Sequence, residues 1–320
     1  MKLNDTFFGS WKIDRRIGSG SYGSVYRLKK NDFGEDYYSA MKVISVSESD
    51  IADDCVKSFT NEFSIMSKLK GNSNIVSYED HEIVKHEEDS GFDILIRMEY
   101  LEPVLRYEKK NGFTEDDIIK LGLDMCTALE LCENAGIIHP DIKPENIFVS
   151  PNGDFKLGDF GISRTLERTA SLSRKGTFAY MAPEVYKGED YGVTADIYSL
   201  GIVLYRFLHA GRLPFVSSAS ASAEERENAV KRRLSGEKIP DGGSDFMKII
   251  LKACSYKPSD RYLNASEMKA DILSYQKKRD EEKKKPPQGI ENNNALMTVM
   301  KVLIALFGTG AVILIVLLLM

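Results

Sequence analysis

The chain has 320 residues, of which 42% are hydrophobic, and its net charge at pH 7 is −5. This length and apolar content can bury one large core or two modest ones, so we expect one catalytic unit. The acidic balance leaves no electrostatic footprint for nucleic acid, and we expect no nucleic-acid partner. The cysteines lack the spacing of a metal site or redox pair, which favours reduced residues of a cytosolic domain: Cys55, Cys126, Cys132 and Cys254.

Residues 1–10 contain no apolar run, so they are not a secretory signal and are assigned as an N-terminal extension. Three strand-like stretches follow, with alternating apolar and polar residues: Trp11 to Ile17, Ser24 to Lys29, and Tyr37 to Ile44. The first two are joined by Gly18-Ser19-Gly20-Ser21-Tyr22-Gly23, which matches G-x-G-x-x-G. Alone this pattern is weak, and glycines of a hairpin turn explain it. Because a strand follows rather than a helix, it favours a flap whose backbone approaches phosphates over a dinucleotide-binding crossover.

Lys42 ends the third expected strand in the apolar setting Ala40-Met41-Lys42-Val43. In isolation, a surface lysine on an edge strand explains it equally well. The next segment, Asp53 to Lys70, has apolar residues at helical spacing, and Glu62 lies beside that apolar stripe. An inward ion pair between Glu62 and Lys42 would fix the ammonium group for the α- and β-phosphates of a nucleotide.

Two further strands are expected at Ile75 to Lys85 and Phe92 to Tyr100, which gives a five-stranded antiparallel sheet with one helix. A short irregular connection follows and predicts a hinge whose backbone could meet a purine edge. Beyond it the pattern is helical, and Thr114 is expected to cap a helix to Asn134 that Gly136 closes. Later helices are expected at Ala195 to His209, Glu224 to Leu234, Ser244 to Ser255 and Asn264 to Gln276.

The stretch from His139 to Gly161 carries the chemistry. Two short apolar strands joined by a turn at Pro151-Asn152-Gly153 predict a hairpin. This hairpin would gather at one rim the polar side chains Asp141, Lys143, Asn146 and Asp159. Hard cations such as Mg²⁺ take oxygen ligands and leave room for phosphate oxygens, so the set indicates a phosphoryl-transfer site. The following segment, Ile162 to Tyr180, lacks periodicity and is expected to be a mobile loop.

The C-terminal region predicts a membrane anchor. Val302 to Met320 is an uncharged run that, as a helix, approaches the thickness of a bilayer core, and we place the transmembrane helix at 297–320. A buried helix of a soluble domain is the alternative, but the run has no polar face. Residues 277–296 combine charges, prolines and asparagines and predict a disordered linker. Its basic residues place the preceding domain in the cytoplasm, with the lipid bilayer as partner of a single-pass C-terminal anchor.

Several motifs occur together in the order and spacing of one family, and the chain resembles a eukaryotic-type Ser/Thr protein kinase. They are the Gly-rich loop, Ala40-Met41-Lys42, the helical Glu62, His139 to Asn146, Asp159-Phe160-Gly161, and Ala182-Pro183-Glu184. The resemblance implies an α+β, bilobal kinase fold at 11–276. It has a small antiparallel sheet N-lobe with one main helix, about 11–100, and a larger, mainly helical C-lobe, about 101–276.

The resemblance also implies residue roles with ATP and Mg²⁺ as cofactors and Ser/Thr-containing proteins as substrates. Asp141 would accept or orient the proton of the substrate hydroxyl, and Lys143 would stabilise the moving phosphate. Asn146 and Asp159 would bind the metal ions, Lys42 would hold phosphates, and Met98 would be the gatekeeper. Nucleotide contacts would come from Ile17, Gly18, Ser19, Gly20, Ser21, Tyr22, Gly23, Val25, Ala40, Lys42, Glu62, Met98, Glu99, Leu101 and Phe148.

Further expectations follow from the resemblance and from one departure from it. Glu184 would pair with Arg261, and Asp196 would brace the catalytic loop. Lys143 and the pair Gly176-Thr177 are similar to Ser/Thr-specific rather than Tyr-specific members. Pro140 departs from the family, because the usual arginine of His-Arg-Asp is the partner of an activation-loop phosphate. Activity is therefore expected to depend less on loop phosphorylation, and autophosphorylation would fall on Thr165, Thr169, Ser171 and Ser173.

Two other functions compete with the kinase interpretation. A pseudokinase would use the same fold as a membrane-tethered scaffold, but every catalytic group is present. A small-molecule phosphotransferase of related fold would not need Ala182-Pro183-Glu184, which belongs to protein-substrate recognition. The apolar C-terminal run lacks GxxxG spacing at Gly308 and Gly310, so dimerisation is possible without a motif that demands it.

Overall fold

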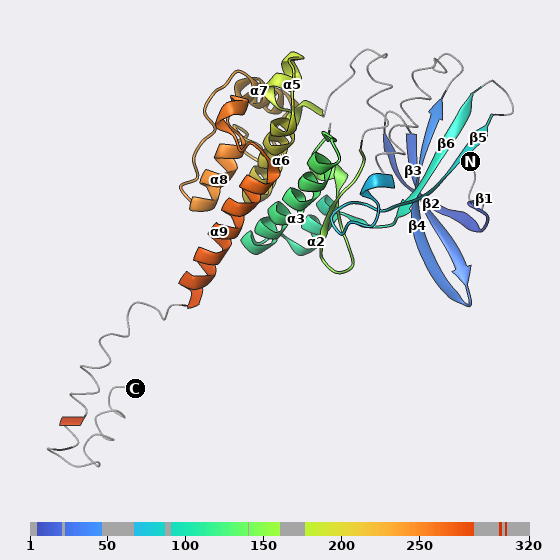
Figure 1. Ribbon diagram of the computed structural model, residues 1–320, viewed down its shortest axis with the longest axis horizontal. Coiled ribbons are helices and arrows are strands. Elements are labelled where there is room, and N and C mark those ends of the chain that lie inside the picture. Colours follow the sequence, from blue (N-terminus) through green and yellow to red (C-terminus); the bar gives the residue numbers. More distant parts are fainter. Residues whose placement is uncertain are drawn as a thin grey trace. The chain divides into compact units, whose positions relative to one another are not determined.

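A computed structural model describes most of the chain: residues 5–20, 23–46, 67–86, 91–139, 141–160, 177–284, 301, 302 and 305. The chain divides into two compact units, Met1–Leu273 and Ser274–Met320. In the first unit, strands β1 to β6 gather on one side and helices α2 to α8 on the other (Figure 1). This arrangement confirms the expected α+β, bilobal architecture.

The N-lobe is a six-stranded antiparallel sheet in the order β1-β2-β3-β4-β6-β5. Its strands are β1 Thr6–Phe7, β2 Trp11–Gly20, β3 Gly23–Asp32, β4 Glu35–Val46, β5 Tyr78–Lys85 and β6 Phe92–Glu99. The five expected strands are confirmed, although the predicted five-stranded sheet is wrong by one strand. The sixth comes from the N-terminal extension, where Phe7 pairs with Trp11. Of the expected helix at 53–70, only the end, at 67–70, lies within the described residues.

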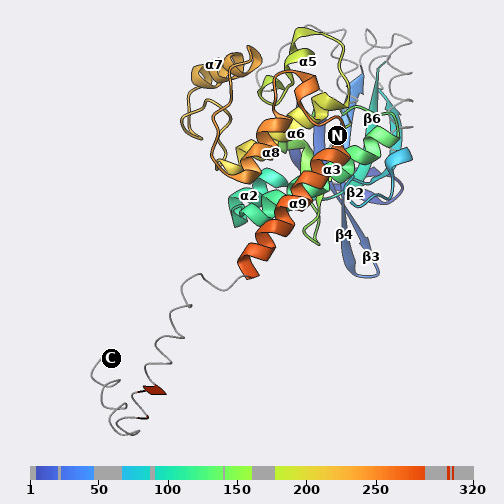
Figure 2. The same cartoon turned by 60° about the vertical axis from the view of Figure 1, so that its left-hand side comes forward.

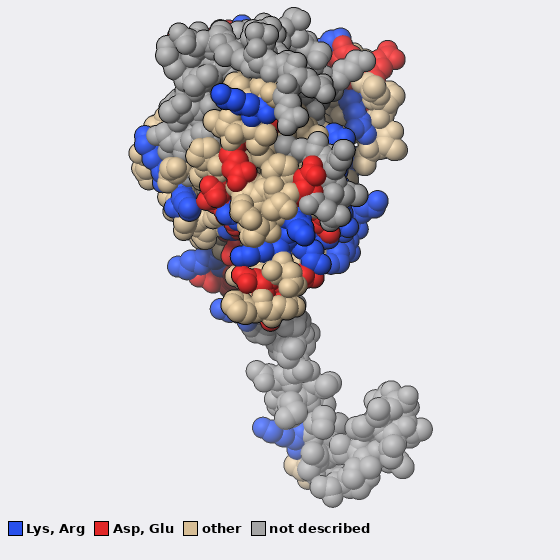
Figure 3. Space-filling model, turned by 90° about the vertical axis from the view of Figure 1, so that its right-hand side faces the viewer, with Lys and Arg blue, Asp and Glu red and all other residues tan. Residues whose placement is uncertain are grey.

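The N-terminal extension covers one face of this sheet. Met41 and Val43 of β4 pack with Leu95 on that face, and Phe7, Phe8 and Trp11 lie against this cluster. The opposite face buries the alternate residues of the same strands, Ile44, Val46, Ile94 and Ile96. Because successive side chains point to opposite faces, both faces of β4 and β6 are buried. On the side of the molecule drawn in Figure 3, basic and acidic side chains lie interspersed over the visible described surface.

The C-lobe consists of helices and a three-stranded sheet in the order β7-β8-β9. The strands are β7 Glu102–Pro103, β8 Ile147–Val149 and β9 Phe155–Leu157. The helices are α2 Val104–Asn111, α3 Glu115–Asn134, α5 Pro183–Lys187, α6 Val193–Leu208, α7 Ala223–Leu234, α8 Asp245–Ala253 and α9 Ala265–Lys284. Thr114 caps α3 through a capping box with Asp117, and Gly136 follows its end at φ +70°, both as predicted.

Helix α6 is the centre of the C-lobe, as its nearly all-round apolar sequence predicts. It is buried along most of its length, and α3 and α8 pack against it (Figure 2). Glycines allow the close approach: a Cβ at Gly201 would lie 2.7 Å from Cys254 Sγ, and one at Gly122 would lie 3.0 Å from Ile272 Cδ1. Cys126, Cys132 and Cys254 are buried free thiols, whereas Cys55 lies outside the described residues. Burial raises the pKa of Cys132 to about 12.

The disordered linker was predicted to begin at residue 277. This start is wrong, because α9 continues to Lys284. The extra residues are mostly Lys, Arg and Glu, which are good helix formers. Pairs such as Lys277 and Glu281 also lie four apart, where opposite charges stabilise a helix. High charge density was therefore a poor guide to disorder at this position.

Within the part of the chain that the structure describes, no helix is both long and apolar enough to cross a membrane. The segment predicted to span, 297–320, lies outside that part except for residues 301, 302 and 305.

The packing of α6 on α8 leads to a stability prediction. Replacing Gly201 with Val should lower the free energy of unfolding by about 1–3 kcal/mol, because the added carbons overpack a site bounded by Cys254 and Ala253. Thermal unfolding should show a midpoint several degrees lower than wild type. Gly192→Ala at the N-cap of the same helix is the control, since nothing lies within 4 Å of its added carbon. Equal midpoints for both variants would contradict the packing argument.

Candidate active site

The predicted hairpin is confirmed: β8 and β9 pair from Ile147 with Leu157 to Val149 with Phe155, and the turn passes through Gly153 at φ +82°. A single 3-10 turn, Pro144–Asn146, leads into β8. The hairpin and the loop before it form a rim at which the expected polar residues meet: Asp141, Lys143, Asn146 and Asp159.

Asp141 is held by two neighbours from the same loop. Lys143 Nζ lies 2.5 Å from Asp141 Oδ2. Asn146, which is 6% exposed, donates from Nδ2 to the Asp141 backbone oxygen at 2.8 Å and to Oδ2 at 3.2 Å. Because Nδ2 makes both bonds, Oδ1 is the Asn146 atom left to bind a cation. The loop therefore presents an oriented carboxylate, an ammonium group and an amide oxygen together.

Asp159 makes a contact between the two lobes. Lys42 Nζ, on β4, donates to Asp159 Oδ1 at 2.6 Å. Burial acts to raise the pKa of Asp159, but the charge and hydrogen bond of Lys42 outweigh burial and lower the pKa. Asp159 is therefore ionised at neutral pH, and its side chain remains 37% exposed and accessible. The expected partner of Lys42, Glu62, lies outside the described residues, so that ion pair stays a prediction.

Gly158 fixes the direction in which Asp159 leaves the hairpin. Its N–H donates to Asn146 O at 2.9 Å, and its carbonyl lies 3.2 Å from His139 Nε2. A Cβ on Gly158 would lie 2.8 Å from Val76 Cγ2, so this position needs glycine. The next residue, Asp159, has φ +56°, a backbone conformation that costs energy in a residue with a side chain. The two candidate metal ligands, Asn146 and Asp159, are thus coupled through one backbone hydrogen bond.

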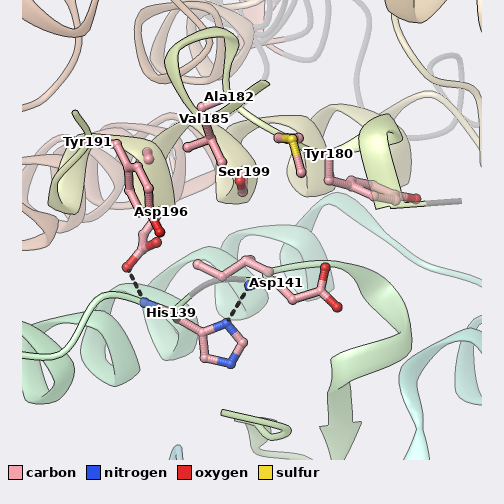
Figure 4. Close-up of a pocket in the computed structure, with 11 residues that line it drawn as sticks. His139, Asp141, Tyr180, Ala182, Val185, Tyr191, Asp196 and Ser199 are labelled. Carbon is pink, nitrogen blue, oxygen red and sulfur yellow. Dashed lines mark hydrogen bonds between the residues drawn. The ribbon is translucent and has the colours of Figure 1, made fainter. Parts of the chain in front are cut away.

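Asp196 braces the catalytic loop from α6, as expected. Its Oδ2 accepts the backbone N–H of His139 at 2.8 Å, and the His139 ring accepts the Asp141 N–H at Nδ1 at 3.2 Å (Figure 4). The ring proton therefore belongs on Nε2, where it reaches the Gly158 carbonyl. Asp196 is 5% exposed, and burial raises its pKa well above the usual range, partly offset by the His139 bond.

A small cavity of about 20 Å³ lies beside Asp141 (Figure 4). Asp141 and His139 line one side of it, and Asp196, Ser199 and Tyr180 line the other, with Met181 also in the lining. Tyr180 and Met181 precede the Ala-Pro-Glu motif, in which Glu184 makes the expected buried pair with Arg261 at 2.6 and 2.8 Å. The cavity thus opens between the Asp141 carboxylate and the segment before that motif.

The expected nucleotide-contacting residues lie along β2, β3, β4 and β6. Gly23 is required at its position, since a Cβ would lie 1.9 Å from Val43 O. Ala40 is buried and pairs in register with Met98. The structure describes most of the others, which belong to these strands or to β8, except that Leu101 follows β6: Ile17, Gly18, Ser19, Gly20, Val25, Lys42, Glu99, Leu101 and Phe148.

Several expected residues lie outside the described part of the chain. They are Ser21, Tyr22, Glu62, Pro140, Gly161, Gly176 and the candidate phosphorylation sites Thr165, Thr169, Ser171 and Ser173.

Two contacts were missed by sequence reasoning. Lys156 Nζ pairs with Glu99 at 2.8 Å, and Glu99 also accepts the Ser77 N–H at 2.6 Å, so the Glu99 side chain links the end of β6 to β9. Arg233 is 3% exposed and binds the segment that lines the cavity. A weak signal existed for Arg233, which lies four residues after Ala229 on the buried face of α7.

Comparison with known proteins is consistent with this geometry. A family model described as protein kinase domain matches residues 11–272. The probable serine/threonine-protein kinase PknB of Bifidobacterium longum is 32% identical over 281 residues, covering 83% of this chain and 40% of that protein. Serine/threonine-protein kinase PknB of Mycobacterium leprae is 35% identical over 162 residues, covering 48% and 25%. Serine/threonine-protein kinase Nek1 of Mus musculus is 29% identical over 257 residues, covering 77% and 20%.

The matches span at most 40% of the length of these three relatives. The similarity therefore concerns one domain of each relative and not the whole protein. The family match, by contrast, covers most of this chain and includes both lobes and the catalytic rim. The chain belongs to the protein kinase family.

Proposed function

We propose that this chain is a serine/threonine protein kinase that transfers the γ-phosphate of ATP to hydroxyl groups of protein substrates. The observation that supports it best is the cluster of charges at the rim. Lys143 contacts Asp141 at 2.5 Å, and Lys42 from the other lobe contacts Asp159 at 2.6 Å. Phosphoryl transfer needs positioning and electrostatic stabilisation more than covalent chemistry from the protein, and this cluster supplies both.

Each residue has a role in this proposal. Asp141 orients the substrate hydroxyl and accepts its proton, while Lys143 stabilises the transferred phosphate. Lys42 binds the α- and β-phosphates. The glycine loop covers the phosphates with backbone N–H groups, and the hinge around Glu99 and Leu101 contacts the adenine.

Mg²⁺ fits the donor set of the site. Asn146 offers a side-chain oxygen, and Asp159 offers a carboxylate that the lowered pKa keeps ionised. When bound, the metal neutralises charge on the phosphate oxygens. Asn146 and Asp159 would hold it, and the Gly158 bond to Asn146 keeps those two ligands in a fixed relation.

We also propose that the C-terminal run anchors the kinase to a membrane with the catalytic domain on the cytoplasmic side. The support comes from sequence: 297–320 contains the uncharged run Val302 to Met320, and the lysine-rich segment 277–285 precedes it.

Pro140 supports a proposal about control. An arginine at this position would bind a loop phosphate, and proline has no group that can. We therefore expect autophosphorylation on the segment 162–176 without a strong requirement for it in activation.

Asp141→Asn should lower phosphate transfer from ATP to dephosphorylated casein on the order of 10²-fold or more, because the amide cannot accept the hydroxyl proton. Lys42→Met should lower it as well by removing the phosphate contact. The measurement is incorporation of radiolabel in the presence of Mg²⁺. Asp154→Asn, on the far turn of the same hairpin, is the matched control, since Asp154 pairs with Lys120 instead.

Equal incorporation of radiolabel by wild type and Asp141→Asn would contradict the kinase proposal and favour a scaffold with the kinase fold. Transfer to small hydroxyl compounds with none to protein would instead favour a small-molecule phosphotransferase. Phosphoamino-acid analysis of the product should show phosphoserine or phosphothreonine.

Deletion of Val302 to Met320 should release active protein into the soluble fraction after cell disruption, because the apolar run is the proposed anchor. Full-length protein should stay with membranes after washing at high salt, which removes electrostatically bound protein. Truncated protein that still pellets with membranes would show that the anchor is elsewhere.

Treatment with a phosphatase should leave initial rates within a few-fold of the untreated enzyme, because Pro140 has no side-chain group that can bind a loop phosphate. A variant with Thr165, Thr169, Ser171 and Ser173 all replaced by Ala should behave in the same way. A tenfold or greater loss in either experiment would refute the proposal about Pro140.

A further inference from the structure

Arg233 joins α7 to the segment before the Ala-Pro-Glu motif. Its Nη1 donates to Met181 O at 2.9 Å and to the Tyr198 hydroxyl at 2.6 Å. Its Nη2 donates to Phe178 O at 2.9 Å and to Ala179 O at 3.1 Å. One side chain on α7 therefore holds three carbonyl groups within four consecutive residues of another segment.

The contacts of Arg233 are those of a buried charge. Its side chain is 3% exposed, and within the described part of the chain no carboxylate lies at ion-pair distance from it. Its guanidinium carbon lies 5.3 Å from the centre of the Tyr198 ring, whose π face also favours a cation. Burying a charge is costly unless polar groups replace the lost water. The burial of Arg233 is thus compatible only with a backbone that points these carbonyls toward it.

The held segment forms one wall of the cavity beside Asp141. Tyr180 and Met181 line the cavity, and Asp141 lies on its opposite wall (Figure 4). The chain just after this segment is fixed separately by the Glu184 pair with Arg261, whose guanidinium lies 4.6 Å from the same Tyr198 ring. Arg233 and Arg261 therefore clamp the two ends of the wall against α6.

We propose that Arg233 is a positioning residue. It sets the shape of the cavity beside Asp141 and thereby the affinity for the protein substrate. The proposal rests on the kinase function proposed above. Arg233 is not placed at the reacting groups, and it acts through the backbone of 178–181. The planar guanidinium spreads its donors over four acceptors, a fork geometry that the compact ammonium of lysine cannot reproduce. Lysine at this position should therefore restore only part of the effect.

The test compares Arg233→Met and Arg233→Lys with wild type. KM for dephosphorylated casein should rise roughly tenfold or more in the Met variant and less in the Lys variant, because misplacing a pocket wall weakens substrate positioning. KM for ATP and the rate of ATP hydrolysis without casein should stay within about twofold of wild type. Arg232→Met is the control, since Arg232 is on the same turn, about half exposed, and pairs with Glu237.

Each outcome decides the proposal. An unchanged casein KM in Arg233→Met overturns it. An equal fall in casein transfer and casein-independent ATP hydrolysis also overturns it, because that result shows a merely structural role. If the Met variant fails to fold, the Lys variant is judged by the same two criteria, and failure of both to fold likewise indicates a structural role. A wild type that transfers no phosphate to any protein would instead remove the kinase proposal itself.

Discussion

The hydrogen bond from the backbone N–H of His139 to the buried carboxylate of Asp196 is the contact on which the catalytic rim depends. It attaches the loop before β8 to α6, the most deeply buried helix of the C-lobe. From His139 the ring continues the chain of contacts to the Asp141 N–H and the Gly158 carbonyl. The positions of Asp141 and of Gly158 therefore both depend on contacts that begin at α6.

Helix α6 also organises the side of the cavity formed by the segment before the Ala-Pro-Glu motif. Tyr198 follows Asp196 by two residues and lies close to the guanidinium groups of Arg233 and Arg261. Burial raises the pKa of Tyr198 to about 12, so its hydroxyl stays protonated near neutral pH. Buried polar groups are costly when unmatched and therefore tolerate few arrangements. An apolar core alone would hold the helices together, but these polar contacts determine where the loops lie.

The sequence predicted those parts of the structure that depend on local chemistry or on family motifs. The Thr114 cap needs only neighbouring residues, and the Glu184 pair with Arg261 followed from the resemblance. Arg233 had only a weak signal, its place four residues after Ala229, and tertiary contacts were needed to separate it from the neighbouring Lys231 and Arg232. Strand β1 has two residues, too few for alternation to show, and the end of α9 has the composition of a linker although its residues are good helix formers.

Asp159 shows why the site needs both lobes. Strand β9 is bonded along one edge to residues 74–76, where Val76 N–H donates to Leu157 O and Leu157 N–H donates to Asn74 O, each at 2.9 Å. One residue later, Gly158 is enclosed by Val76 and Phe148, which leaves its backbone little freedom. Asp159 can hold a left-handed conformation because these neighbours over-determine it, and Lys42 of the other lobe then fixes its carboxylate. A shift of either lobe must therefore displace the one carboxylate that Lys42 and the metal would share.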